Sequence, residues 1–212
     1  MKGMIERNSF YIITLLITAA LLIPLFFRQP VENTISLDNR TVSISIVKSL
    51  PILLILLFIS LHGTTENREH RGWKRPAAVD IPFIILFLTF TTILSFIFPA
   101  ADGSYSVSIH GVKGILLICI FALVTALSEE LFFRSWLING MKSAGWPGWL
   151  VFSLPVLFFA SLHIWQGWNG FLFAAISGSL YTLYFMRRGR LFPLFFSHAI
   201  HNALALILMS VR

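Results

Sequence analysis

Of the 212 residues, 57% are hydrophobic and only 12% are charged, with a formal net charge of +7. A soluble domain carries about 25% charged residues, so this chain has too little polar surface to cover a water-exposed globule. The composition therefore excludes an ordinary soluble enzyme and indicates an integral membrane protein, which the arrangement of the apolar residues in long blocks supports.

Seven apolar blocks are interpreted as membrane-spanning helices, each of which needs about 20 apolar residues. They cover residues 9–27, 42–61, 81–100, 112–137, 149–164, 168–186 and 191–209. The first block is not followed by a small-x-small cleavage site, so we expect a retained helix and not a signal peptide. The fifth block is the shortest, and Pro155 inside it predicts a kink. The sequence thus predicts an all-α, polytopic bundle of about seven spans.

Lys and Arg gather in alternate connections between these blocks. One set consists of Lys2, Arg7, Arg68, Arg71, Lys74, Arg75, Arg134, Lys142, Arg187, Arg188 and Arg190, and the smaller set of Arg28, Arg40, Lys48, Lys113 and Arg212. The positive-inside rule then predicts a cell (plasma or inner) membrane protein with a cytoplasmic N-terminus and an external C-terminus. Topology and anionic lipids explain the basic residues, so we expect membrane lipids as partners and no nucleic acid.

Ionisable residues within a span cost about 2.5–3.5 kcal/mol each and are therefore functional hypotheses by default. In the fourth block, Glu130 and Arg134 lie four residues apart, so they share one helix face and neutralise each other. Glu129 is rotated from Glu130 by about 100° and must find another partner. A carboxylate without a full counter-charge in a dry site can serve as a general base. The alternative is an interfacial charge cluster at the helix end.

Histidines mark the fifth and seventh blocks. Phe159 and His163 lie four residues apart on an otherwise apolar helix, where a lone histidine often only bonds to a neighbouring helix. In the last block His198 and Asn202 share a face, while His201 is offset from Asn202 by about 100°. We expect His201 to border the site or to bond to another helix. Packing alone does not account for three such groups on one membrane helix.

Glu129, His163, His198 and Asn202 together form a set that can hydrolyse a peptide bond without a nucleophilic side chain. A Glu–His pair can hold and deprotonate a water, while a second His and an Asn donate hydrogen bonds to the oxyanion. His163, His198 and Glu129 also have the composition of a His₂Glu zinc site. We expect no cofactor, with a divalent metal such as Zn²⁺ as the alternative.

The three motifs EExxxR (Glu129, Glu130, Arg134), FxxxH (Phe159, His163) and HxxxN (His198, Asn202) follow one another on successive apolar helices. In this order they resemble the CAAX-protease and bacteriocin-processing (CPBP, or Abi) family of intramembrane glutamic endopeptidases, over about residues 112–209.

The resemblance implies a catalytic core of four helices within residues 112–212, preceded by helices without an identified motif in residues 1–111. It implies that Glu129 and His163 activate water, that His198 and Asn202 stabilise the oxyanion, and that Glu130, Arg134 and Phe159 support the site. The implied substrates are membrane-anchored proteins with CAAX-type C-termini, leader peptides or C-terminal sorting tails.

Two other functions are compatible with parts of the sequence. Ser177 in Ala175-Ile176-Ser177-Gly178 resembles the nucleophile of rhomboid serine proteases, although the same small residues are typical of close helix packing, and a serine mechanism leaves both glutamates without a role. A non-catalytic transporter or immunity protein is the other alternative, because intramembrane Glu and His also line cation paths.

Overall fold

The computed structural model describes residues 35–62, 65–99, 105–108 and 111–210, and this part of the chain is almost entirely helical. The first predicted span, residues 9–27, lies outside the described residues. The helices are α2 (Asn39–Leu61), α3 (Thr65–His70), α4 (Asp80–Ile97), α5 (Gly111–Glu130), the π-helical η1 (Leu131–Ile138), α6 (Asn139–Ser143), α7 (Gly148–Ser161), the 3₁₀ turn η2 (Ile164–Gln166), α8 (Gly167–Arg188) and α9 (Phe192–Ser210). Two three-residue strands, β1 (Ile35–Leu37) and β2 (Tyr105–Val107), pair in parallel with Ile35 opposite Tyr105.

Four helical segments of the described chain are long and apolar enough to cross a membrane. They are α2, α4, the 33-residue segment Gly111–Ser143 formed by α5, η1 and α6, and α9. The helices α7 and α8 meet the criterion only as a pair, with a bend of 49° at the break between them, so the described residues contain four candidate spans, or up to five. The predicted count of about seven is therefore not confirmed.

Within the described residues, the predicted and observed spans differ at α7 and α8. With 14 residues, α7 is shorter than the roughly 20 that a span requires. Pro155 lies inside α7, and the helix continues past it, so the break comes later, at the turn that contains His163 and η2. In α8, small and polar residues such as Ser177, Gly178 and Ser179 lower the apolar character of the helix.

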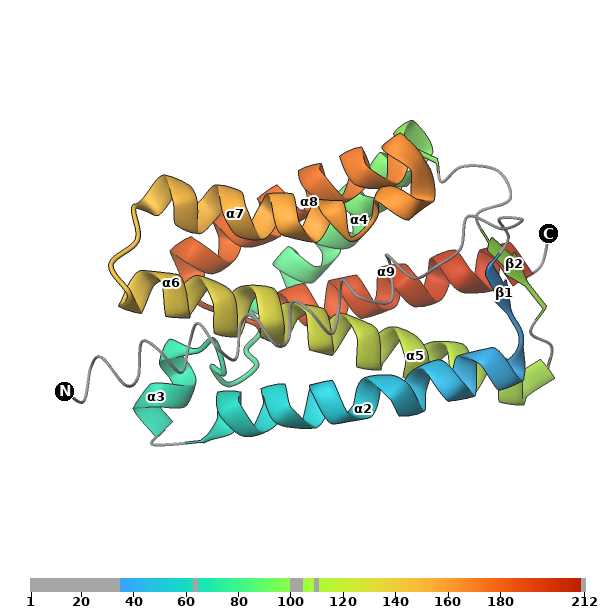
Figure 1. Cartoon of the computed structure of the whole chain (residues 1–212), viewed down its shortest axis with the longest axis horizontal. Coiled ribbons are helices and arrows are strands. Elements are labelled where there is room, and N and C mark those ends of the chain that lie inside the picture. Colours follow the sequence, from blue (N-terminus) through green and yellow to red (C-terminus); the bar gives the residue numbers. More distant parts are fainter. Residues whose placement is uncertain (1–34, 63–64, 100–104, 109–110, 211–212) are drawn as a thin grey trace.

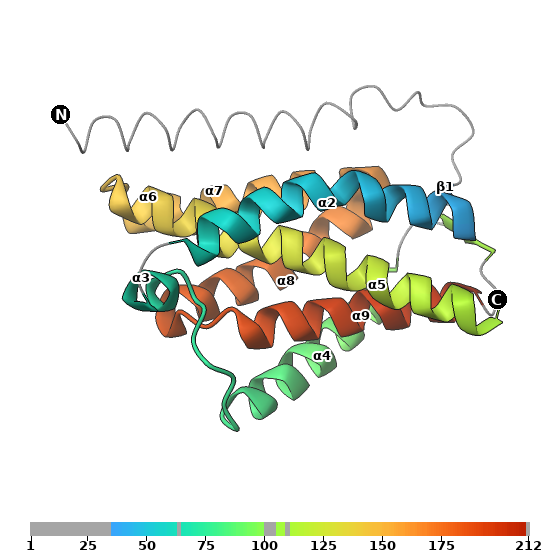
Figure 2. The ribbon, with the colours of Figure 1, turned by 90° about the horizontal axis from the view of Figure 1, so that it is seen from below.

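The helices form one bundle in which α5 lies between α2 and α9 along the long axis of the molecule (Figures 1 and 2). The helices α7 and α8 pack against each other, and α4 packs obliquely against α9. Leu56 of α2 and Phe87 of α4 belong to the same hydrophobic core as Phe132 of η1, Phe159 of α7 and Phe185 of α8. The core thus extends into the first half of the chain, and a separate four-helix core in the second half is not confirmed.

The outer faces of the helices carry apolar side chains, as helices in lipid require. Phe58 of α2 is 68% exposed and Phe96 of α4 is 81% exposed. Exposing such apolar side chains to water is unfavourable, whereas lipid tails can cover them. This bundle of apolar helices is therefore that of a multi-pass membrane protein.

One end of the bundle is held together by an ion pair between two connections. Arg190, between α8 and α9, contacts the buried Asp80 at the start of α4 through Nε (2.5 Å) and Nη2 (2.6 Å), and Nη2 also donates to the carbonyl oxygen of Arg75 (2.9 Å). The Asp80 carboxylate raises the pKa of the Arg190 guanidinium through these hydrogen bonds. Leu191 N donates to Gly72 O at 3.0 Å, which further joins the two connections.

This end, with α3 and the α6–α7 turn in Figure 1, is strongly basic. The Lys and Arg residues of its connections and helix ends are Arg68, Arg71, Lys74, Arg75, Lys142, Arg187, Arg188 and Arg190. Arg40 and Lys113 lie near the opposite helix ends. The sequence analysis grouped Arg134 with the basic connections. Its side chain is only 1% exposed and lies in the centre of the bundle, so it is not one of the connection charges that the positive-inside rule counts. Lys and Arg are still more numerous at this end of the bundle without it, and the orientation in the membrane remains a prediction.

Cysteine labelling tests the orientation. In a Cys119→Ser background, Lys142→Cys and Arg188→Cys should react with a membrane-impermeant maleimide only from the cytoplasmic side, because the positive-inside rule places the basic end there. Lys113→Cys, at the other end of the Gly111–Ser143 segment, should react only from outside. Labelling of residues 113 and 142 from the same side would show that this segment does not cross the membrane.

Candidate active site

The EExxxR motif lies where α5 becomes the π-helix η1. Glu129 and Glu130 end α5, and all residues of η1 except Trp136 are buried. Single π-helical turns inside α-helices are rare and occur frequently at functional sites. Glu130 and Arg134 nevertheless face each other as predicted, with 3.1 Å between Glu130 Oε1 and Arg134 Nη1.

Arg134 is almost completely buried, with 1% of its side chain exposed. Its guanidinium carbon lies 5.0 Å from the centre of the Phe159 ring and 5.7 Å from that of Tyr181. Nη2 points to the carbonyl oxygen of Gly178 in α8 at the long distance of 3.5 Å. A carboxylate, two aromatic faces and a backbone carbonyl thus replace part of the water that this cation loses on burial, while Nε has no partner among the described residues.

His198 of α9 contacts both glutamates of α5. Its Nδ1 lies 3.0 Å from Glu130 Oε1, and its Nε2 lies 3.5 Å from Glu129 Oε2. A carboxylate oxygen can only accept, so Nδ1 carries a proton. The predicted pairing of Glu130 with Arg134 is confirmed, and His198 contacts the same carboxylate oxygen as a second partner.

The two adjacent glutamates have different surroundings. The side chain of Glu130 is 0% exposed, whereas that of Glu129 is 30% exposed. Two carboxylates and the Arg134 guanidinium leave one negative charge in this cluster, and a protonated His198 brings the total to zero. Glu129 is thus the partly exposed carboxylate of the pair, and Glu130 is the fully buried one.

His163 follows the end of α7, and Phe159 connects it to the cluster. His163 Nδ1 donates to the carbonyl oxygen of Phe159 at 2.9 Å, so the neutral imidazole presents the lone pair of Nε2. The Phe159 ring centre lies 4.7 Å from that of His163 and 6.2 Å from that of His198. Among the described residues, no hydrogen bond or ion pair joins His163 to Glu129 directly.

Gly178 of α8 lies directly against the Phe159 ring. A Cβ atom at Gly178 would lie 3.0 Å from Cδ1 of this ring, closer than about nine in ten real contacts of this kind, so a side chain here would push the ring aside. The glycine therefore lets the α8 backbone pack directly on the aromatic ring that lies over Arg134.

The two histidines of α9 face different neighbours. His198 faces the glutamates of α5, whereas the His201 ring stacks on Phe173 of α8 with 5.4 Å between ring centres and 19° between planes. Asn202, one turn after His198, is half-buried, and its side chain makes none of the hydrogen bonds found within the described part of the chain. The HxxxN spacing thus selected the histidine that contacts the carboxylates.

Tyr181 and Ser197 belong to the surroundings of the cluster, and the sequence analysis missed them. Tyr181 Oη and Ser197 Oγ lie 2.9 Å apart, and the Tyr181 ring meets that of His198 edge to face at 6.1 Å. A buried tyrosine in an apolar helix needs a partner for its hydroxyl, which is the signal that could have identified Tyr181.

Two alternatives for this site find no support in the geometry. Ser177 Oγ donates to the carbonyl oxygen of Phe173 at 2.7 Å, and among the described residues it has no imidazole partner that could activate it. Within the same residues, no group of three or more His, Cys, Asp and Glu side chains is placed to hold a metal ion.

Comparison with known proteins identifies the motif-bearing half of the chain. Residues 111–204, somewhat less than half of the sequence, match the family described as Rce1-like, type II CAAX prenyl endopeptidase. The matched segment contains the EExxxR, FxxxH and HxxxN motifs, and it confirms the resemblance to the CPBP proteases. No curated protein and no solved structure matched the chain.

Proposed function

We propose that the protein is an intramembrane endopeptidase with a glutamate-activated water, because residues 111–204 match the Rce1-like family of type II CAAX prenyl endopeptidases. The family is a protease family, and the apolar helices agree with a multi-pass membrane enzyme. The observation that supports the proposal most strongly is the convergence of Glu129, Glu130 and Arg134 with His198 from a distant helix.

In this mechanism Glu129 is the general base. It is the partly exposed glutamate, so it can hold a water that Glu130 cannot reach. The Nε2 lone pair of His163 accepts a second hydrogen bond from the same water and orients it. The water oxygen attacks the carbonyl carbon of the scissile peptide bond while its proton moves to the Glu129 carboxylate.

His198 and Asn202 act on the tetrahedral intermediate. The 3.5 Å between His198 Nε2 and Glu129 Oε2 exceeds the roughly 2.7–2.9 Å of a strong charge-assisted hydrogen bond, so the Nε2 proton can turn to the oxyanion. The Asn202 amide donates the second hydrogen bond. Glu130 holds Nδ1 and stabilises the imidazolium. Glu129 then gives its proton to the departing amine as the C–N bond breaks, which leaves a free carboxylate and a free amine.

The proposed substrates are membrane-anchored proteins with CAAX-type C-termini, which the family description names as prenylated. We further propose a cell-membrane location with the basic end of the bundle in the cytoplasm, where prenylated C-termini and anionic lipids are accessible. No step in this mechanism requires a metal, a prosthetic group or a nucleic acid partner.

Replacement of Glu129 tests the general base. Glu129→Gln keeps the shape of the side chain and removes the base, so cleavage should slow by about 10²–10⁴-fold. The measurement is the release of the C-terminal tripeptide from a farnesylated CAAX peptide by purified protein in detergent, followed by mass spectrometry. Glu69→Gln, an exposed carboxylate outside the site, is the matched control and should be fully active. If Glu129→Gln has normal activity and Ser177→Ala is inactive, the glutamate mechanism is wrong and Ser177 is the nucleophile.

Replacement of the two α9 histidines tests the oxyanion donor. His198→Ala should lower turnover by about 10²–10³-fold, the effect of losing one such donor. His201→Ala should retain most of the activity, because its ring stacks on Phe173 and does not contact the glutamates. The same assay with a chelator should give an unchanged rate. An inactive His201 variant beside an active His198 variant, or a chelator-induced loss that Zn²⁺ reverses, would contradict the proposed roles.

A further inference from the structure

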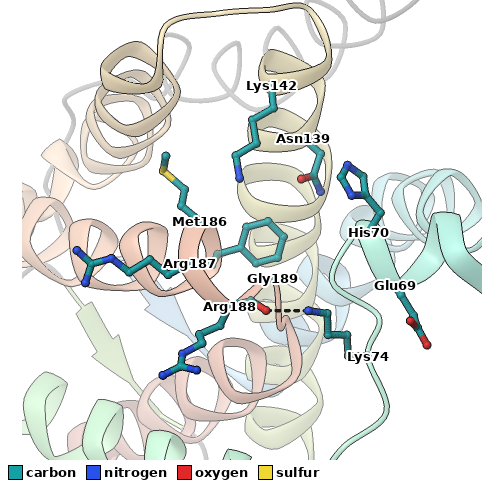
Figure 3. A pocket seen from close by; sticks show the side chains of 10 residues that line it. Glu69, His70, Lys74, Asn139, Lys142, Met186, Arg187, Arg188 and Gly189 are labelled. Atoms are coloured by element: carbon teal, nitrogen blue, oxygen red, sulfur yellow. Dashed lines mark hydrogen bonds between the residues drawn. The ribbon is translucent and has the colours of Figure 1, made fainter.

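A second polar feature of the molecule is an open-sided cavity of about 400 Å³ at the basic end of the bundle (Figure 3). It lies where the connection after α3, the end of the α6 helix and the C-terminus of α8 meet. The residues that line it include Lys74, Asn139, Lys142, Phe185, Arg188 and Gly189. None of them belongs to the candidate active site, so this cavity is independent of the proposed protease function.

Lys74 and Lys142 approach the cavity from different elements. Figure 3 shows both side chains directed into it, whereas the side chains of Glu69 and Arg187 point away. Lys74 Nζ donates to the carbonyl oxygen of Arg188 at 2.9 Å, which holds the ammonium group at the mouth and uses one of its three protons. Two ammonium groups with unused donors therefore face the same space.

The charge of the lining is not balanced by the protein. Four cationic residues and one acidic residue line the cavity, Lys74, Lys142, Arg187, Arg188 and Glu69. In Figure 3 the charged ends of Lys74 and Lys142 point into it, whereas those of Arg187, Arg188 and Glu69 point away. Among the described residues, none of these five takes part in an ion pair. The C-terminus of α8 offers only about half a negative charge, and His70 adds none when neutral. A net positive charge thus remains around a space that a small anion can enter.

The position of the cavity indicates which anion it meets. The 33-residue segment Gly111–Ser143 ends beside it, and so does α8. The ends of membrane-spanning helices lie at the depth of the lipid headgroups, where basic pockets between helices bind phosphate groups. We propose that this cavity binds the phosphate of an anionic membrane lipid, with Lys74 and Lys142 as the principal donors.

Titration with an anionic lipid tests this site. The full chain in neutral detergent is titrated with short-chain phosphatidylglycerol, and bound lipid is counted by native mass spectrometry, with phosphatidylcholine as the neutral reference. The wild type should bind one phosphatidylglycerol saturably. Lys74→Gln/Lys142→Gln should weaken binding by roughly 25-fold, about fivefold for each charge near a headgroup. Arg75→Gln/Lys113→Gln removes the same charge outside the cavity and should change binding by less than about twofold.

Two further arms separate the remaining explanations. Lys74→Arg/Lys142→Arg keeps the charge and should bind within about threefold of the wild type, and a thermal melt of each variant verifies that it is folded. Inorganic phosphate at millimolar concentration should not displace the lipid. Equal losses in the cavity and control variants, loss of binding in the arginine variant, or displacement by inorganic phosphate would each overturn the proposal of a lipid site.

Discussion

The buried carboxylate of Glu130 is the interaction on which the rest of the site depends. A carboxylate with no exposure is stable only if it is paired and hydrogen-bonded, because leaving a buried charge without its partner costs about 3–5 kcal/mol. Arg134, one turn further along, supplies one partner, and His198 of α9 supplies the other. The second partner fixes α9 against α5, and these two helices pack closely along the bundle. Satisfying one charge therefore determines the rotation and the height of the helix that carries His198.

The same requirement explains the surroundings of the cluster. Arg134 must also be compensated, and it lies against the faces of Phe159 from α7 and Tyr181 from α8. Gly178, which has no side chain, leaves room for the Phe159 ring in this position. Glu130 is buried between Arg134 and His198, so Glu129 is the more exposed carboxylate beside His198. Two glutamates that are neighbours in the sequence thus come to differ in surroundings: Glu130 is buried and contacts Arg134 and His198, whereas Glu129 is partly exposed.

Contacts within one helix could be predicted from the sequence, whereas contacts between helices could not. The spacing of four residues correctly paired Glu130 with Arg134 and distinguished His198 from His201. The contact between Glu130 and His198 depends on how far α9 is shifted along α5. The periodicity of apolar residues within each helix does not predict this shift. The π-helix could not be predicted from a pattern of 3.6 residues per turn. Arg134 was wrongly counted among the basic connections, because the residues that bury it come from α7 and α8. The predicted count of about seven spans is not confirmed, because an apolar block does not reveal that α7 has only 14 residues.

A double-mutant cycle on Glu130 and His198 tests the central interaction most directly. The free energy of unfolding in detergent is measured for the wild type, Glu130→Gln, His198→Ala and the double variant. If the two side chains share a buried hydrogen bond, the cycle should give a coupling of about 1–3 kcal/mol, whereas the same cycle with His201→Ala should be additive. Additivity within about 0.5 kcal/mol for Glu130 and His198 would contradict the account, because Glu130 would then not hold the imidazole in place.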